Sequence, residues 1–121
     1  MIKAYLLTTG ADGHSHVQEG HLADAVPYDV HTVSFKETAP HSFLDWHTAP
    51  DTQYVVCLTG TLHFVTHTGE EFTLHPGEVL IAMDITGTGH KWQMQGNDPW
   101  RRVYIVFDSA KGINFVPEDD K

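Results

Sequence analysis

Short stretches in which apolar residues alternate with polar ones follow one another along most of the chain. A period of two places successive side chains on opposite faces, as in a strand with one buried face. The expected strands cover residues 4–9, 14–22, 30–36, 43–47, 53–58, 61–66, 71–74, 79–83, 90–95 and 102–107. Turns rich in glycine and proline separate many of them, and no long run has the i, i+3, i+4 apolar spacing of an amphipathic helix. This pattern is typical of an all-β sandwich or barrel.

The length of the chain, 121 residues, suits one domain with a core of its own. We therefore expect a single domain over residues 1–121, ending in a solvated acidic tail at 117–121. No stretch approaches the ~18 apolar residues that cross a bilayer, and the first apolar run is too short for a signal sequence. Cys57 is the only cysteine, so no internal disulfide can form. These features predict a cytoplasmic protein with no membrane partner.

The formal charge of −9, with only seven lysines and arginines, argues against nucleic acid as a partner. The basic residues Lys91, Arg101 and Arg102 are dispersed, and no phosphate cradle is evident among them. The ten histidines are many for this length and are expected to make the net charge strongly dependent on pH between about pH 5 and 8.

Four polar residues in the middle of the chain form a candidate site. Asp45 and His47 lie two positions apart, so on a strand they share a face. Gln53 begins the next expected strand, and a turn at residues 86–89 leads into His90. We expect the four side chains to meet inside a barrel. Two imidazoles and a carboxylate suit Fe(II), Mn, Ni or Zn, with Gln53 as a weaker fourth ligand or as a group that orients water or substrate.

The same residues resemble the two motifs of the cupin superfamily, G-x5-H-x-H-x3/4-E-x6-G and G-x5-P-x-G-x2-H-x3-N. The matching positions cover about residues 43–94 and include Asp45-Trp-His47, Gln53-x6-Gly60, Gly69, Pro76-Gly77 and His90. Two positions depart from the pattern, since Asp45 stands where the family has its first histidine and Gln53 where it has glutamate.

The resemblance implies a small single-domain cupin, an all-β jelly-roll barrel with a small-molecule pocket. In metal-binding cupins three histidines and one glutamate hold the metal; carried over, these positions are Asp45, His47, Gln53 and His90. Small cupins commonly pair through outer strands, so the resemblance also implies a homodimer. Trp46 and Tyr54, expected on the face opposite the site, are candidates for that interface.

The phases of the strands extend the expected pocket beyond the four polar residues. Val55 and Cys57 share the phase of Gln53, while Trp92 and Met94 share that of His90. Ordinary barrel filling is the alternative for Trp92 and Met94. No base lies beside Cys57 in the sequence, which favours a small buried hydrophobe over a nucleophile.

The remaining histidines are weaker candidates, and most are expected to be structural or solvated. His14 and His16 have ligand-like spacing, and His16 is a candidate for the pocket mouth. His41 precedes the key strand and is a candidate for supporting a ligand. His63, His67 and His75 are equally weak candidates for metal ligands.

Two functions of different classes follow from this site. The leading one is a metal-assisted enzyme of small-molecule metabolism, of the dioxygenase, isomerase or cyclase type. The alternative is a non-enzymatic protein that binds or senses a small ligand and has lost the metal. The Asp45, His47 and His90 set favours the enzyme, and the neutral Gln53 favours the binding protein.

Overall fold

A computed structural model describes residues 1–118 of the chain. Eleven strands and one 3-10 helix, η1, make up its regular structure. In order they are β1 (Lys3–Thr9), β2 (Ser15–His21), β3 (Thr32–Thr38), β4 (Phe43–His47), β5 (Gln53–Thr59), β6 (Thr61–Thr66), β7 (Glu71–Leu74), β8 (Val79–Ala82), β9 (His90–Gln95), β10 (Trp100–Val106), η1 (Ser109–Lys111) and β11 (Val116–Pro117). The all-β prediction is therefore confirmed.

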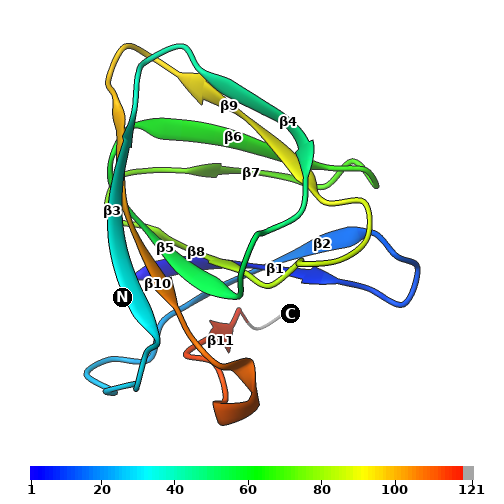
Figure 1. The fold of residues 1–121 in the computed structure, drawn as a ribbon, viewed down its shortest axis with the longest axis vertical. Coiled ribbons are helices and arrows are strands. Elements are labelled where there is room, and N and C mark those ends of the chain that lie inside the picture. Colours follow the sequence, from blue (N-terminus) through cyan, green and yellow to red (C-terminus); the bar gives the residue numbers. More distant parts are fainter. Residues whose placement is uncertain (119–121) are drawn as a thin grey trace.

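The strands form two sheets that face each other (Figure 1). The larger has the order β11-β2-β1-β8-β5-β10-β3, and the smaller has the order β4-β9-β6-β7. All pairings are antiparallel except that of β1 with β8. The strands β3 and β4 are edge strands of different sheets and do not pair, so the sheets are not closed into the expected barrel.

The predicted strand boundaries agree with the observed ones to within about two residues, because alternation and turn residues mark them locally. Gly60 separates β5 from β6 and adopts a φ of 92°. A Cβ there would lie 2.9 Å from the Pro99 carbonyl oxygen, so the turn requires glycine in two ways.

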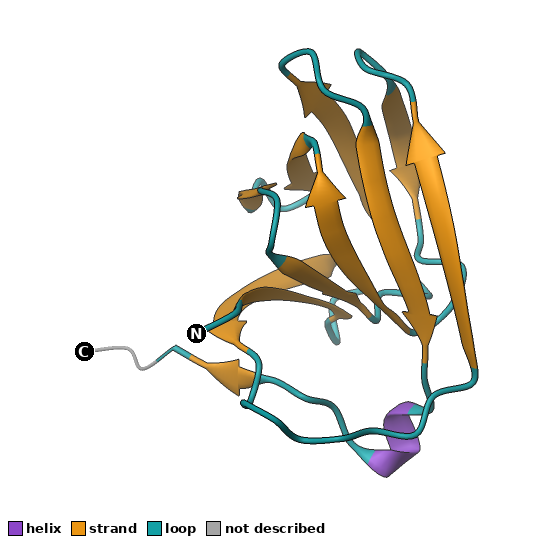
Figure 2. Ribbon diagram, turned by 90° about the vertical axis from the view of Figure 1, so that its left-hand side faces the viewer, coloured by secondary structure: helices purple, strands orange, loops and turns teal. Residues whose placement is uncertain are grey.

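The C-terminal segment is exposed where it is described, as expected of Pro117 and Glu118, but it also pairs with the body of the molecule. Val116–Pro117 pairs with β2 as β11, and the Glu118 carboxylate lies 2.7 Å from Lys3 Nζ. In Figure 2 the chain passes through η1 and returns along the molecule to this strand. The rest of the predicted tail, residues 119–121, lies outside the described residues.

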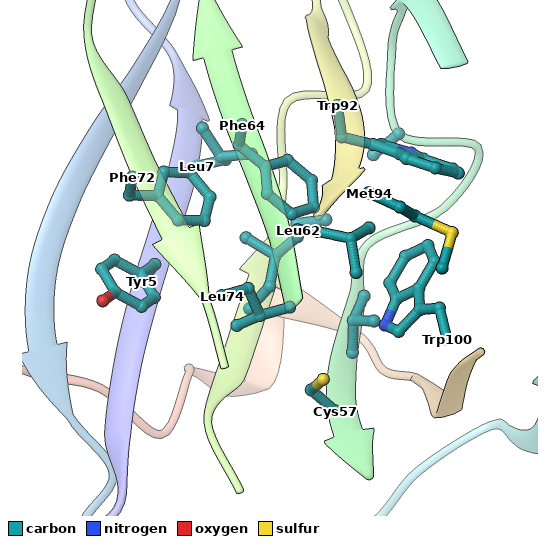
Figure 3. Packing of buried hydrophobic residues seen from close by; sticks show 14 residues of the cluster. Tyr5, Leu7, Cys57, Leu62, Phe64, Phe72, Leu74, Trp92, Met94 and Trp100 are labelled. Carbon is teal, nitrogen blue, oxygen red and sulfur yellow. The ribbon is translucent and has the colours of Figure 1, made fainter. Parts of the chain in front are cut away.

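Part of the space between the sheets is filled by apolar side chains (Figure 3). Tyr5 stacks on Phe72 with ring centroids 4.5 Å apart, and Phe72 stacks on Phe64 at 4.8 Å. Leu62 and Leu74 are fully buried beside them. This cluster contains side chains from both sheets, so the burial of its apolar surface stabilises their packing against each other.

A second apolar cluster lies on the other face of the larger sheet. Tyr54 stacks on Phe107 at 4.4 Å, and its hydroxyl accepts a hydrogen bond from the Asn114 amide. Tyr54 is therefore buried by its own chain, which removes it from the expected dimer interface. Trp46, the other residue expected there, stacks on the exposed His67 with ring centroids 3.6 Å apart.

In residues 1–118 no helix is long and apolar enough to cross a membrane.

Candidate functional site

A cavity of about 810 Å³ occupies the part of the intersheet space that the apolar cluster leaves open. This volume falls in the range of small-molecule pockets. Its wall comes from β3, β4, β5, β6, β8, β9 and β10, from Ser42 and from the 48–51 loop. The edge strands β3 and β4 both contribute, so the cavity lies where the two sheets remain unjoined.

Two imidazoles meet in this cavity. His47 at the end of β4 pairs in register with His90 at the start of β9, and their ring centroids lie 4.4 Å apart at an interplanar angle of 63°. Gln53, at the start of β5, is buried and lines the same cavity. Three of the four predicted site residues therefore come together.

Asp45 does not join them. The pairing of β4 with β9 shifts register between Leu44 and His47, and this irregularity breaks the simple alternation that would put Asp45 and His47 on one face. Asp45 is exposed and is not part of the cavity wall. Its carboxylate accepts a hydrogen bond from the amide of Trp46 instead.

The predicted metal set is consequently not assembled. Among residues 1–118 no three His, Cys, Asp or Glu side chains are placed to hold one ion. His47, His90 and the amide of Gln53 remain, without the carboxylate that was to supply charge. These three do not fit the three-ligand protein site expected from the sequence.

A buried carboxylate that the sequence reasoning missed orients His90. Asp84 is fully buried, and its Oδ2 accepts hydrogen bonds from Ser15 Oγ and from His90 Nδ1, both at 2.6 Å. The bond at Nδ1 leaves Nε2 as the ring nitrogen available to the cavity. The Asp84 carbonyl also accepts a bond from the Ala49 amide, which joins this group to the 48–51 loop. An acidic residue directly after the apolar β8 run was the signal for it.

The ring of His47 is also held by a hydrogen bond from Nδ1, in this case to a main-chain carbonyl oxygen. Its Nδ1 donates to the Asp45 carbonyl oxygen at 2.7 Å, so Nε2 is again the free nitrogen. Burial lowers the pKa of His47, and the nearby His90 lowers it further. Near neutral pH His47 is therefore an uncharged imidazole.

Gly89 permits the close approach of the two histidines. Its φ is 73°, and a Cβ there would lie 2.0 Å from the His47 carbonyl oxygen. Any side chain would push the loop before β9 away from the end of β4.

The four predicted pocket residues divide into two pairs. Val55 and Trp92 line the cavity. Cys57 and Met94 share the expected inward face but lie two residues further along their strands, where Leu62 and Trp100 fill the space (Figure 3). Burial raises the pKa of the Cys57 thiol to about 11, in keeping with a small buried hydrophobe.

A second missed residue, Arg102, lies on the opposite part of the wall. Its side chain is only 3% exposed, and its guanidinium stacks on Trp100 at 3.7 Å. The signal was its phase on β10, which it shares with Trp100 and Tyr104, two aromatic residues of a strand that is otherwise half buried.

Several histidines outside the cavity contact residues near them. His16 bridges Asp12 and Glu70, with Nε2 2.8 Å from the first carboxylate and Nδ1 2.5 Å from the second. His14 Nδ1 lies 3.0 Å from the Thr88 hydroxyl. His41 occupies a turn with a φ of 70° and is exposed.

No model of a known protein family matches this sequence, and no curated protein matches it either.

Proposed function

We propose that this protein is an enzyme of small-molecule metabolism that moves a proton on its substrate, with His90 as the general base. The observation that carries the proposal is the buried Asp84–His90 pair at the wall of an 810 Å³ cavity. A carboxylate at Nδ1 holds the ring in one orientation and stabilises the imidazolium formed when Nε2 takes a proton.

The neighbouring residues support a reaction of the isomerase type. His90 Nε2 would accept a proton from a substrate carbon beside a carbonyl group and return it at another position, so no external reactant is consumed. The side-chain amide of Gln53 would donate a hydrogen bond to the substrate oxygen on which negative charge develops. Nε2 of neutral His47, whose ring centroid lies 4.4 Å from that of His90, carries a lone pair and would accept a hydrogen bond from a substrate hydroxyl.

The test is deuterium incorporation in D2O, followed by proton NMR over a panel of small ketones and oxo acids. His90→Gln should slow the exchange by about 10²–10⁴-fold, the usual contribution of a positioned base. His63→Gln is the matched control, because His63 pairs with Glu71 outside the cavity. Absence of exchange for the whole panel, in a protein that binds panel members, would favour the non-enzymatic binding protein.

A metal-assisted enzyme is the second candidate, and one observation favours it. Both cavity histidines have Nδ1 engaged by an oxygen acceptor and Nε2 free, which is the usual state of histidines that bind metals. Calorimetric titration with Zn²⁺ and Mn²⁺ tests it. Gln53→Glu should strengthen binding, because it adds an anionic oxygen to the two imidazoles. The same weak heat for wild type and Gln53→Glu would count against this candidate.

The finer description of the fold is also a proposal, namely a jelly-roll of the cupin type. It is supported by the order of the turn residues Gly60, Pro76-Gly77 and Gly89 between strands of the expected bounds. A homodimer is supported by exposed apolar side chains on the outer strands, such as Phe35 at 77% and Phe43 at 72%. Sedimentation velocity at micromolar concentration checks the dimer, and a monomer would refute it.

A further inference from the structure

Two of the seven basic side chains of this acidic protein lie on the wall of one cavity. Lys36 on β3 and Arg102 on β10 are direct cross-strand partners, and both line it. Cross-strand partners on one face have Cβ atoms about 5 Å apart, and two like charges in that position destabilise the sheet. Because the repulsion between Lys36 and Arg102 destabilises the sheet at a cavity wall, the pair indicates a negatively charged ligand that offsets this repulsion.

Arg102 lacks an anionic partner within residues 1–118. Its Nε donates to the Tyr104 hydroxyl at 3.0 Å, and its Nη1 donates to Thr38 Oγ1 at 2.6 Å and to the Trp100 carbonyl at 3.1 Å. All three acceptors are neutral, whereas buried charges in proteins are normally paired with an opposite charge. The neighbouring Arg101 shows the contrast, since it is exposed and bonds to Glu37 at 2.9 Å.

Several hydrogen-bond donors around Arg102 have no acceptor among residues 1–118, so a ligand that accepts hydrogen bonds would satisfy them. The hydroxyls of Tyr104 and Thr38 use lone pairs to accept from the guanidinium, so each keeps an O–H to donate. Nη2 makes no hydrogen bond to the described residues, and the Lys36 ammonium adds further donors. Hydrogen-bond donors and positive charge therefore lie together here without a negatively charged acceptor in the part of the chain that the structure describes.

We propose that this group is an anion-binding subsite that holds the carboxylate of the substrate. The name anion subsite is used below for Lys36, Thr38, Arg102 and Tyr104. The inference rests on the proposed function, because it names the substrate class of the same cavity: an organic acid with its carboxylate at the anion subsite and its reacting carbon at His90.

The wall between the two ends suits the apolar body of such an acid. Trp92 lies two residues after His90 on β9, and its ring meets that of Trp100 edge to face with centroids 5.0 Å apart. Trp100 in turn underlies the Arg102 guanidinium. Val55, Leu80 and Ala82 are among the other apolar residues of the wall.

The wall also favours a carboxylate over a phosphate dianion. Asp51 is the one carboxylate on the cavity wall within residues 1–118, and it forms no ion pair with Lys36 or Arg102 there. Its negative charge would repel a doubly charged group more than a singly charged one. The two cations are also few for a phosphate, which commonly takes additional main-chain donors.

Isothermal titration calorimetry with three probes of similar shape tests the subsite: benzoate, the neutral benzamide and phenyl phosphate. Benzoate should bind about tenfold or more tightly than benzamide, because its bonds to the cations are charge-assisted. Equal affinities, absence of benzoate binding up to about 10 mM, or tighter binding of phenyl phosphate would overturn the proposal.

Variants locate the effect on the wall. Lys36→Gln should weaken benzoate binding about three- to tenfold and leave benzamide binding unchanged, since only a charge is removed. Arg102→Gln should weaken it more, and circular dichroism shows whether this buried variant folds. Arg101→Gln is the matched control on the opposite face of β10, and it should change nothing. If Arg101→Gln lost as much benzoate affinity as Lys36→Gln, a specific subsite would be refuted. Lys36 is exposed, so its substitution should leave the fold intact and the test valid even if Arg102→Gln unfolds.

The results also separate this inference from the proposed function. Benzoate binding that depends on Lys36, together with no deuterium exchange in any panel member, would leave the anion subsite standing and refute catalysis. Exchange in neutral ketones without benzoate binding would refute the subsite alone.

Discussion

The two ends of the intersheet space share strands β5 and β9, and yet one end is packed and the other holds a cavity. On β9 the inward residues His90 and Trp92 line the cavity, while Met94 on the same face is packed. On β5 the inward residues Gln53 and Val55 line it, while Cys57 is packed. The inward face of a strand thus does not decide whether a side chain meets a neighbour or a cavity.

The difference comes from what the facing elements supply. At the packed end, Tyr5 of β1 and Phe72 of β7 bring large rings that fill the space (Figure 3). At the hollow end, β3 contributes short polar side chains, Thr32, Ser34 and Thr38, together with Lys36. Polar groups there would lose hydration without gaining contacts if the space closed, so an open cavity is the lower-energy arrangement.

The largest expected effect contrasts two leucines, one at each end. Leu62→Ala in the packed end should lower the free energy of unfolding by about 3–5 kcal/mol, because it leaves a new void among close-packed atoms. Leu80→Ala at the cavity wall should cost about 2–3 kcal/mol, since part of its surface already lacks packing partners. Urea denaturation measures both, and equal losses would show that the two ends are equally packed.

The next effect tests the junction of the two histidines. Gly89→Ala should cost more than about 2 kcal/mol, because it adds a left-handed backbone strain to a clash with the His47 carbonyl. Gly96→Ala is the matched control, with a φ of 74° and no atom within 4 Å of the added Cβ. It should cost about 1 kcal/mol from backbone strain alone. Similar losses in the two variants would mean that the loop before β9 adjusts freely.

A smaller effect concerns the thiol at the packed end. Because the pKa of Cys57 rises to about 11 from its ordinary 9.0, the folded protein resists forming the thiolate. The contribution of the buried thiol to the free energy of unfolding is complete below pH 9 and is lost as the pH rises toward 11. At pH 8 a thiol reagent such as DTNB should react no faster than the protein unfolds. Rapid labelling of the folded protein would show that this end is open.

The smallest effect compares an exposed histidine with a cavity histidine. Hydrogen bonding to Glu70, and then to Asp12, raises the pKa of His16 above its ordinary 6.5. Its stabilisation is therefore present below pH 6.5 and is lost as the pH rises through the raised pKa. His47 has the opposite sign: its pKa is lowered by burial, so stability falls as the pH drops below 6.5.

Thermal melts between pH 5 and 8 separate the two contributions. His16→Gln should remove the loss at higher pH, and His47→Gln should remove the loss at lower pH. NMR titration of the histidine ring protons gives the sign for each residue directly. The same pKa for both would contradict the contrast between the exposed bridge and the cavity.

The strands, their turns and most of the inward faces could be predicted from the sequence, because these depend on neighbours along the chain. Alternation placed His90 and Trp92 on one face, and the turn at 86–89 led correctly into His90. The homodimer candidate Tyr54 was misjudged because its cover, Phe107, comes from a segment 53 residues later. No local pattern encodes such a contact.

The sequence by itself determined the all-β class and the strand bounds, since spacing and phase are local quantities. The meeting of His47 with His90 joins strands 43 residues apart, and the sequence suggested it only through the resemblance to the two cupin motifs. The tertiary structure alone decided that Asp45 leaves the site, because a shift of register in β4 reverses the face of a side chain. It alone also decided that Asp84 holds His90 and that Lys36 and Arg102 share a wall. Lys36 and Arg102 lie on strands far apart in the chain, whereas Asp84 is only six residues before His90 and is buried by the fold around it. The free energy of burying these polar groups depends on the partners that folding brings to them.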